Sequence, residues 1–419
     1  MPYSDSHDVD VVVVGAGAAG LAAAQTLVDS RRTVAVLEAK DRIGGRAYTA
    51  TAGLRTAFDH GCYWLHSADE NPFTGIADRL GFRYDRGARP RLIHFGDRWA
   101  DPAEQQEWDA FFDDSFDAIV AVGNDGRDVA VADVLPKHPR WSAPFARFVA
   151  AFSGADPPRA STLDFALYRD TDVDWPVIDG YGALVARYGA GVPVRLDTPA
   201  TRIDGRGKLV RVETPAGALA ARAAIVTVSN GVLAAGALRF DPPLPDSVLA
   251  AIAGIPMGMA NKVAFEFDRD VFGDAAPGTV GFSARGQGLI GFQIRPAGSG
   301  LAIGYVGGSA ASELEALGPA GMAAHALDEL AAIFGSAIRQ RVTGAATTAW
   351  ESDPWIRGGY TAALPGEAHR RADLAAPFDE RVFLAGEACS PEFFSTAHGA
   401  YLSGVAVARA VAGRLAAAA

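Results

Sequence analysis

The sequence predicts a two-domain α/β fold, in which an α+β domain is inserted into a discontinuous Rossmann-type domain. A strand, a glycine-rich turn, a helix and a second strand follow one another over residues 9–45. Strand patterns of this kind return at 193–228 and 382–384, and the segments between them are rich in aromatic residues. Alternating strands and helices form parallel sheets. The expected boundaries are 1–72, 177–256 and 354–419 for the first domain, and 73–176 and 257–353 for the second.

Local patterns predict the individual elements. The β-branched run at 9–14 predicts a strand, and the next residues predict a helix over 17–30 followed by a strand at 33–37. Aromatic residues three or four positions apart predict a helix over 104–122. Further expected elements are short strands within 193–228 and 257–306, a helix at 320–335, a strand at 382–384 and a helix from about 396.

Composition excludes several classes of protein. The chain has 419 residues, 49% hydrophobic and 21% charged, which is typical of a globular enzyme-sized protein. Two cysteines are too few for a disulfide scaffold or a Cys-based zinc site. A net charge of −11 argues against nucleic-acid binding. The uncharged run at 11–28 contains three glycines and follows acidic residues, so we expect no signal peptide, no membrane span and a cytoplasmic protein. The oligomeric state stays open.

A dinucleotide-binding fingerprint opens the chain. Gly15, Gly17 and Gly20 form GAGAAG between the first strand and the first helix, and Glu38 ends the next strand. The first glycine permits the tight turn, the second lets a pyrophosphate approach, and the third lets the helix pack on the strand. The first residues of the helix, Ala18 and Ala19, offer backbone N–H groups to a phosphate. The Glu38 carboxylate would accept hydrogen bonds from the hydroxyl groups of a ribose.

The residues after Glu38 distinguish among dinucleotides. The string EAKDRIGGR resembles the ExxxRxGGR motif of the flavin-containing amine oxidases, a family that includes monoamine oxidases, polyamine oxidases and lysine-specific histone demethylases. The resemblance covers nearly the whole chain and is closest to the polyamine oxidase branch. It implies bound FAD, with Ala39, Gly44 and Gly45 close to the cofactor and with Arg42 and Arg46 beside its phosphates.

A second similar segment is DHGCYWLHSADENP at 59–72. It resembles the family segment beside the flavin ring, which implies contacts from Gly61, Cys62, Tyr63 and Trp64. His66 would lie in the substrate channel. From the residues alone a histidine after an apolar Trp-Leu pair is more often structural, and it is the resemblance that favours the channel position. The neighbouring acids at 69 and 70 would help to attract a cationic amine.

Two more segments match the family. The run 193–230 resembles its second cofactor segment, in which the backbone of Ala200 faces the adenine. VFLAGE, followed by STAHGAYLSG, resembles the third flavin segment. That match implies contacts from Gly386 and Glu387 to the ribityl chain, and it places Thr396 and Ala397 at the start of the last helix, where a helix N-terminus stabilises a reduced, anionic flavin.

The substrate face is expected from WESDPWIRGGY at 350–360, which resembles the family's WxxDPWxxGSY. This implies that Trp355 contacts the cofactor and that Tyr360 faces the substrate. Gly359 stands where monoamine oxidases attach flavin through cysteine, so we expect non-covalent FAD. Thr396 stands where those enzymes have a second cage tyrosine. By its alternation alone Lys262 is a solvated strand lysine, but GMANKVAFEF resembles the segment whose lysine holds a water at the flavin.

These features predict FAD-dependent oxidation of an amine. The expected catalytic residues are Lys262, Tyr360, His66 and Thr396. The expected partners are a small-molecule amine and O2, and the expected product of O2 is hydrogen peroxide. We expect no metal ion to be needed. Three alternatives stay open. An L-amino-acid oxidase would need an arginine for the substrate carboxylate, which relatives carry where this chain has 63–66. A dehydrogenase or desaturase would pass electrons to another acceptor. A chromatin-binding partner would need a long helical insert that is missing here.

Overall fold

The computed structural model describes residues 7–87, 91–95, 98–275, 280–283 and 288–417. The strands expected within 257–306 include residues 276–279 and 284–287, which lie outside the described residues.

The first sheet has eight strands among the described residues, in the order β12-β9-β10-β11-β1-β2-β8, with β20 also paired to β11. The valine-rich β1 lies at its centre and runs parallel to β2 and β11. The expected strands at 9–14 and 382–384 are confirmed. Its strands are β1 (Val9–Val14), β2 (Val34–Leu37), β8 (Val194–Arg195), β9 (Arg202–Asp204), β10 (Val210–Thr214), β11 (Gly217–Val226), β12 (Arg239–Asp241) and β20 (Val382–Leu384).

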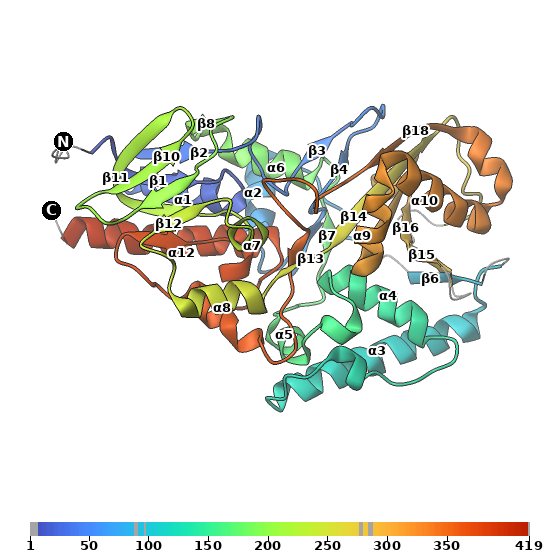
Figure 1. Ribbon diagram of the computed structural model, residues 1–419. Helices are drawn as coiled ribbons and strands as arrows, with labels where there is room; N and C mark the ends of the chain where they lie inside the picture. Colours follow the sequence, from blue (N-terminus) through green and yellow to red (C-terminus); the bar gives the residue numbers. More distant parts are fainter. Residues whose placement is uncertain (1–6, 88–90, 96–97, 276–279, 284–287, 418–419) are drawn as a thin grey trace.

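Both faces of this sheet are buried, which explains why β1 is apolar at every position after Asp10. Val11 and Val13 pack in the core that contains helices α1 (Ala18–Asp29) and α12 (Ala397–Ala417), whereas Val12 and Val14 pack in the core on the opposite face. The two helices lie side by side along the sheet (Figure 1). A Cβ at Gly404 of α12 would come within 2.1 Å of the Ala19 carbonyl oxygen, so this close contact requires glycine.

The second sheet is six-stranded within the described chain, in the order β18-β14-β17-β16-β15-β6. Helices α9 (Ser309–Ala316) and α10 (Gly318–Phe334) cover one of its faces, which confirms the helix expected at 320–335. Its strands are β6 (Arg91–His94), β14 (Ala260–Phe267), β15 (Val280–Ser283), β16 (Gly291–Ile294), β17 (Leu301–Gly307) and β18 (Val342–Thr347).

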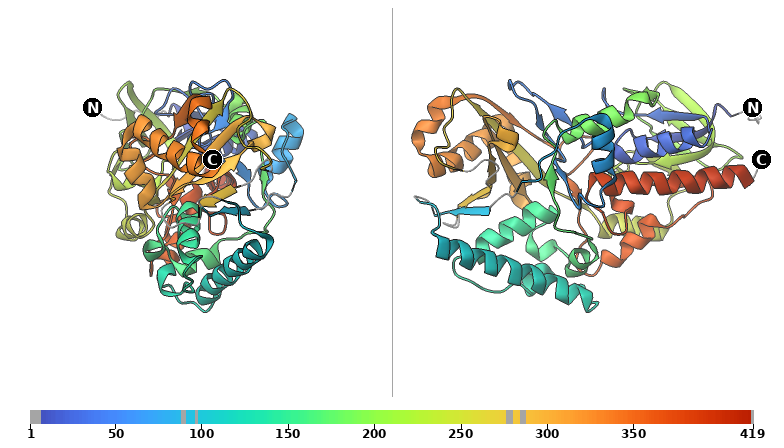
Figure 2. Two further views of the ribbon diagram at one scale, coloured as in Figure 1. Left: turned by 90° about the vertical axis from the view of Figure 1, so that its right-hand side faces the viewer. Right: turned by 180° about the vertical axis from the view of Figure 1, so that it is seen from behind.

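A helical layer lies below the second sheet (Figure 2). Helix α3 (Pro102–Asn124) confirms the helix expected over 104–122, and Asp101 with Glu104 forms the capping box that starts it. The aromatic side chains of α3, including Trp108 and Phe112, pack against α4 (Ser142–Ser153) and α5 (Thr162–Leu167).

The remaining elements link the two sheets or flank them. They are β3 (Thr49–Ala50), β4 (Phe58–Asp59), β5 (Trp64–Leu65), α2 (Pro72–Leu80), β7 (Trp175–Pro176), α6 (Tyr181–Tyr188), α7 (Asn230–Ala234), α8 (Asp246–Gly254), β13 (Met257–Gly258), β19 (Tyr360–Thr361) and α11 (Arg371–Ala375).

The strands of the first sheet all come from 1–72, 177–256 and 354–419, and those of the second from 73–176 and 257–353. We propose the same division for the two domains.

Candidate active site

One continuous cavity of about 520 Å³ reaches from the glycine-rich turn after β1 to α4 and β16. All but two of the residues expected to be catalytic or to bind the cofactor line it, and the exceptions are Gly20 and Arg42. Those that line it are Gly15, Gly17, Ala18, Ala19, Glu38, Ala39, Gly44, Gly45, Arg46, Gly61, Cys62, Tyr63, Trp64, His66, Ala200, Lys262, Trp355, Tyr360, Gly386, Glu387, Thr396 and Ala397.

Bare backbone forms one end of the cavity. Gly15 has φ +102°, and a Cβ there would meet the Thr227 hydroxyl at 2.5 Å. At Gly17 the nearest atom to a Cβ would be 4.0 Å away, and at Gly386 nothing lies within 4 Å, so both positions are open toward the cavity. We call Gly15, Gly17, Gly44, Gly45 and Gly386 the glycine cradle.

Gly20 does not line the cavity but packs against the backbone of Gly15 in the cradle. A Cβ there would come within 1.9 Å of the Gly15 carbonyl oxygen, so glycine lets the first turn of α1 pack on the strand-to-helix turn. This is the packing role expected of the third glycine in the fingerprint. Gly20 therefore shapes the cavity without lining it.

Glu38 is buried directly after β2. Its carboxylate accepts hydrogen bonds from the backbone N–H groups of Ala16, at 2.7 Å, and Lys40, at 3.0 Å. Burial raises its pKa despite these two donors. Each carboxylate oxygen has two acceptor sites, so Glu38 keeps capacity for the hydroxyl groups of a ligand.

The two arginines of the EAKDRIGGR string have different positions. Arg42 donates to the Gly45 carbonyl oxygen at 2.8 Å, and its guanidinium lies 3.8 Å from the ring centre of Tyr48. It does not line the cavity, so its expected place beside the phosphates is not what the structure shows. Because both contacts hold the chain around the turn, Arg42 fixes the backbone of the cradle.

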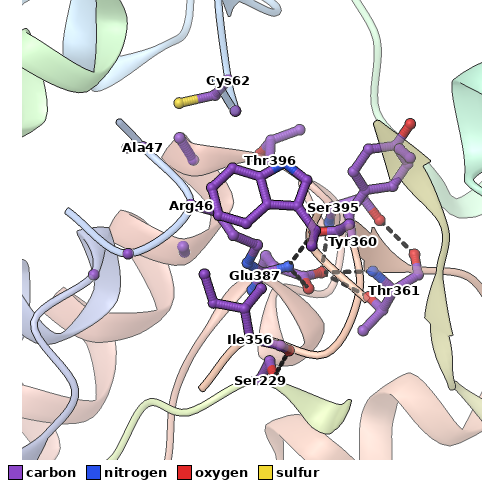
Figure 3. Close-up of a pocket in the computed structure, with 18 of the residues that line it drawn as sticks. Arg46, Ala47, Cys62, Ser229, Ile356, Tyr360, Thr361, Glu387, Ser395 and Thr396 are labelled. Atoms are coloured by element: carbon purple, nitrogen blue, oxygen red, sulfur yellow. Dashed lines mark hydrogen bonds and ion pairs between the residues drawn. The ribbon is translucent and has the colours of Figure 1, made fainter. Parts of the chain in front are cut away.

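Arg46 does face the cavity and joins two distant segments. It donates to Glu387, at 2.9 Å, and to the Gly359 carbonyl oxygen, at 2.7 Å (Figure 3). Glu387 also accepts from the Thr361 hydroxyl at 2.6 Å and from the Ser395 N–H at 3.0 Å. Burial acts to raise the pKa of Glu387, but Arg46 and the Thr361 hydrogen bond outweigh it and lower that pKa.

The last helix begins at the cavity wall. The Thr396 hydroxyl accepts from the Gly399 N–H at 2.9 Å and donates to the Phe393 carbonyl oxygen at 2.7 Å, so it caps α12. The Thr396 hydroxyl therefore already makes two hydrogen bonds to backbone groups of the chain. Ala397, the first residue of α12, lines the cavity with the positive end of a 21-residue helix.

Aromatic side chains line the opposite end, around α4. Tyr360 donates its hydroxyl to the Ala151 carbonyl oxygen of α4, which fixes its ring at the cavity. Phe152 packs against Tyr168 with ring centres 5.9 Å apart, and Tyr168 packs against Phe394 at 5.5 Å. Trp355 is 40% exposed and lies at the cavity margin.

Lys262 is buried, so the solvated position indicated by strand alternation is wrong. Strand β14 is covered on both faces, because α9 and α10 pack on one side and β3–β4 residues on the other. The Lys262 ammonium donates to the carbonyl oxygens of Asp59, at 2.8 Å, and Gly61, at 2.5 Å. Burial lowers its pKa to about 8, although Asp59 acts in the opposite direction.

His66 lies at the cavity wall with Nδ1 2.9 Å from Asp174. Burial acts to lower its pKa, but the Asp174 carboxylate raises it above the ordinary value. The acids expected to attract substrate do not line the cavity, since Asp69 accepts from the Thr171 hydroxyl and Glu70 pairs with Arg169. That expectation is wrong, because the chain at 169–171 folds back on both.

Gly61, Cys62, Tyr63 and Trp64 form the wall between the two ends of the cavity. A Cβ at Gly61 would come within 1.6 Å of the Arg46 carbonyl oxygen, so only glycine fits there. Burial raises the pKa of the Cys62 thiol, which disfavours the reactive thiolate.

Apart from Lys262, sequence reasoning missed the cavity residues that come from the inserted domain. The end of the cavity next to α4 is called here the α4 lobe. No motif in these segments distinguishes a residue that lines the cavity from one that is packed in the core. Its defining residues are Arg147, Phe148, Phe152, Tyr168, Lys262, Leu289, Gly291, Gln293 and Tyr305.

The site fits FAD. It combines a bare glycine cradle, a helix N-terminus and an acid placed for a ribose, which together bind a dinucleotide. The cavity also continues past a second helix N-terminus, that of α12, into the α4 lobe. The fold and site thus define the class of dinucleotide-dependent oxidoreductases.

Comparison with known families identifies the chain further. Residues 138–412 match the family model described as flavin containing amine oxidoreductase, and residues 13–80 match the NAD(P)-binding Rossmann-like domain. The chain belongs to the flavin-containing amine oxidoreductase family, whose cofactor is FAD.

Individual relatives cover almost the whole chain. Lysine-specific histone demethylase 2 of Homo sapiens is 27% identical over 97% of this chain and 54% of its own length, and polyamine oxidase 4 of Oryza sativa is 29% identical over 95% and 87%. The chain spans about half the length of the demethylases it matches. The solved structure of wild-type putrescine oxidase bound to putrescine shares the fold, with a TM-score of 0.81 at 21% identity over 97% of this chain and 99% of that one.

The described residues contain neither a helix able to span a membrane nor a cluster of side chains able to hold a metal ion. None of the helices there combines the length and the apolar character needed to cross a bilayer. Among the same residues no group of three or more histidine, cysteine or acidic side chains is placed to hold a metal ion.

Proposed function

We propose that this chain oxidises the C–N bond of a primary or secondary amine and that it holds FAD without a covalent bond. The observation that carries the proposal is the continuity of the cavity from the glycine cradle to the α4 lobe, with Tyr360, Thr396 and the lobe residue Lys262 all in its lining. When bound, FAD supplies a two-electron acceptor that takes a hydride from the carbon next to nitrogen. The resulting imine would add water and give a carbonyl compound and ammonia or a smaller amine, and the two electrons held by the reduced cofactor would pass with two protons to O2 to give hydrogen peroxide.

The chain would hold the dinucleotide mainly through backbone. The glycine cradle and the first N–H groups of α1 would bind the pyrophosphate, and Glu38 would accept the ribose hydroxyls. Glu387, oriented by Arg46 and Thr361, would face the sugar-alcohol chain, and the N-terminus of α12 would stabilise negative charge on the ring.

The α4 lobe would orient the amine and exclude water. Tyr360 and Phe152 present aromatic surface, which is compatible with both an apolar substrate body and an amine nitrogen. Lys262, held by two carbonyl oxygens, would fix a water and place positive charge where O2 is reduced.

An anaerobic screen of mono-, di- and polyamines tests the reaction, because a productive amine bleaches the yellow flavin without O2. Admission of air should then restore the colour and yield one hydrogen peroxide per amine. Bleaching without reoxidation by air would identify a dehydrogenase instead. Absence of bleaching by every amine would contradict amine oxidation.

Acid denaturation tests the non-covalent link. All yellow colour should pass into the supernatant, because Gly359 occupies the expected attachment position and the Cys62 thiol is held protonated by burial. Flavin retained on the precipitated chain would contradict the proposal, and its absence from a Cys62→Ser variant would identify Cys62 as the attachment point.

A further inference from the structure

We propose that Tyr305 is a positioning residue for Lys262: the aromatic ring keeps the buried ammonium charged at the cavity wall. The inference rests on the proposed function, in which the Lys262 charge assists the reduction of O2, and it adds a residue that controls this charge. The string GMANKVAFEF, which singled out Lys262, does not contain Tyr305, because the two residues lie on different strands.

Lys262 and Tyr305 are direct neighbours across two strands. They lie opposite one another in the antiparallel pair of β14 and β17, and Gly291 of β16 lies opposite Tyr305 on its other side. Residues paired in this way project from the same face of a sheet, and all three line the cavity. Gly291 has no side chain that would compete with the Tyr305 ring for this face.

The contact between the two side chains is a cation–π contact. The Lys262 Nζ lies 4.9 Å from the centre of the Tyr305 ring and 5.8 Å from that of the Tyr63 ring. The negative face of a ring attracts an ammonium within about 6 Å of its centre, and the attraction is larger at a desolvated site. Lys262 is only 7% exposed, and burial raises the pKa of the Tyr305 hydroxyl well above its ordinary value. The ring therefore faces the ammonium as a neutral group.

A hydrogen bond fixes the far end of the Tyr305 ring. Its hydroxyl donates to Oε1 of Gln293 at 3.1 Å, and Gln293 is only 1% exposed. Gln293 pairs with Ile303 in the ladder between β16 and β17, so its amide and the Tyr305 hydroxyl come from adjacent strands. The ring is therefore positioned by groups of the second sheet itself.

The ring also leaves one donor of the ammonium for another partner. An ammonium has three N–H groups, and Lys262 donates to two carbonyl oxygens, those of Asp59 and Gly61. Because a ring face attracts the whole charge electrostatically, the third N–H remains for the water proposed above.

Besides the two tyrosines, three titratable groups face Lys262 within the described chain. The Asp59 carboxylate acts to raise the pKa of Lys262, and it is itself bound by three donors of the chain. Burial and the Lys262 charge lower the pKa of His60 to about 4, and burial raises the pKa of the Cys62 thiol, so both groups are neutral at pH 7. Tyr305 thus stabilises the ammonium without adding a second negative charge that would cancel it, and the remaining positive charge can stabilise an anion formed from O2.

A titration of Lys262 tests the contact directly. The chain has four lysines, at 40, 137, 208 and 262, so carbon-13 at the ε position of lysine gives four NMR signals whose shifts follow the charge of each side chain. In the FAD-loaded chain, Tyr305→Leu should lower the pKa of Lys262 from about 8 by about one pH unit, because the charged form loses its partner. Tyr305→Phe keeps the ring and should keep this pKa within about 0.3 pH unit of the parent.

Tyr188→Leu is the matched control, because it removes a half-buried tyrosine ring that lies outside the cavity. The pKa of Lys262 should be unchanged in this variant, and the signals of the other three lysines should be unchanged in every variant. A pKa of Lys262 that changes by less than about 0.3 pH unit in Tyr305→Leu, or that falls equally in Tyr305→Phe, would overturn the proposal.

The pH dependence of reoxidation separates this role from a structural one. The bound flavin is reduced with dithionite, so no amine is needed, and its reoxidation by O2 is followed at pH 6.5 and pH 8. If the pKa falls by about one pH unit, the charged fraction of Lys262 falls about fivefold at pH 8 but less than about twofold at pH 6.5, and the rate in Tyr305→Leu should follow. Equal slowing at both pH values, in a chain whose Lys262→Met variant is slow, would show that Tyr305 acts only structurally.

The two measurements distinguish failure of this proposal from failure of the proposed function. If no amine reduces the flavin, amine oxidation fails. If Lys262→Met is reoxidised like the parent, the role of Lys262 with O2 fails. In both cases the lysine titration still decides whether the Tyr305 ring holds the charge.

Discussion

The glycine cradle and the α4 lobe are two ends of one cavity, built in opposite ways. The cradle is mostly backbone from short, continuous motifs, in which glycines let the chain turn and approach a ligand. The lobe is mostly side chains from α4, β14, β16 and β17, which are far apart in sequence. The difference teaches that the cofactor is recognised by local geometry, whereas substrate recognition depends on long-range packing.

If this comparison holds, pH should affect the two ends differently. Removal of hydride requires a neutral amine, and for an alkylamine with pKa near 10.4 the neutral fraction rises about tenfold per pH unit. We expect kcat/KM to rise by up to about 1000-fold between pH 6 and 9, while the affinity for FAD changes little. Stopped-flow reduction and flavin titration at each pH measure both quantities. A flat kcat/KM profile would contradict oxidation of an alkylamine.

The junction between the two ends should depend most on Glu387. Glu387→Gln leaves Arg46 without its buried partner and should lower the free energy of unfolding by about 3 kcal/mol at pH 7. The native pKa of Glu387 is lowered, so its stabilisation is present above the ordinary value of 4.5 and is lost as pH falls through the native pKa. Urea unfolding should show the difference from the parent chain shrinking below about pH 4.5.

Glu313→Gln is the control for this prediction, because Glu313 is exposed on α9 and its charge should matter little. An equal loss of stability in both variants, or a loss that is independent of pH, would refute the role of the Arg46–Glu387 pair.

The cradle can be blocked without disturbing the lobe. Gly17 has φ −74°, which any residue can adopt, and a Cβ there would meet only ordinary contacts. Gly17→Val should therefore fold but weaken FAD binding at least 100-fold, or about 2.8 kcal/mol. Isothermal titration of the apoprotein with FAD measures this. Gly191→Val, at an exposed glycine with open space around it, should bind FAD like the parent. Unchanged affinity in Gly17→Val would place the pyrophosphate elsewhere.

The lobe can be tested by removing the Lys262 charge. Lys262→Met should slow flavin reduction or reoxidation at least tenfold, or about 1.4 kcal/mol of barrier. It also leaves the carbonyl oxygens of Asp59 and Gly61 without their donor, so some loss of stability is expected. Stopped-flow measurement of flavin reduction and of reoxidation on the folded, flavin-loaded variant shows whether Lys262 affects either rate.

The pH dependence adds a sharper criterion for Lys262. Its pKa is about 8, so the ammonium loses its proton as pH rises through that value. Reoxidation by O2 should slow above pH 8 in the parent chain, and this decline should be absent in Lys262→Met. If both half-reactions of the variant stay within twofold of the parent, Lys262 has no catalytic role.

The sequence by itself determined the Rossmann-type sheet, the discontinuous arrangement and most of the cavity lining near FAD. The sheet follows from local physics: the valines at every position of β1 after Asp10 require burial on both faces, and GAGAAG permits one tight turn into one helix. Glu387 and Ala397 were singled out by the resemblance of their segments to the family's third flavin segment, and both line the cavity.

Only the tertiary structure decided which charged groups face the cavity. Lys262 is buried because a second layer covers the outer face of β14, which alternation within the strand cannot reveal. Asp69 and Glu70 are bound by residues about a hundred positions later, and Arg42 supports the turn instead of facing a ligand. Arg147 and Gln293 line the same cavity, although a helix and a strand from separate segments carry them. The free energy of burying a charge depends on all its neighbours, and those neighbours exist only in the folded chain.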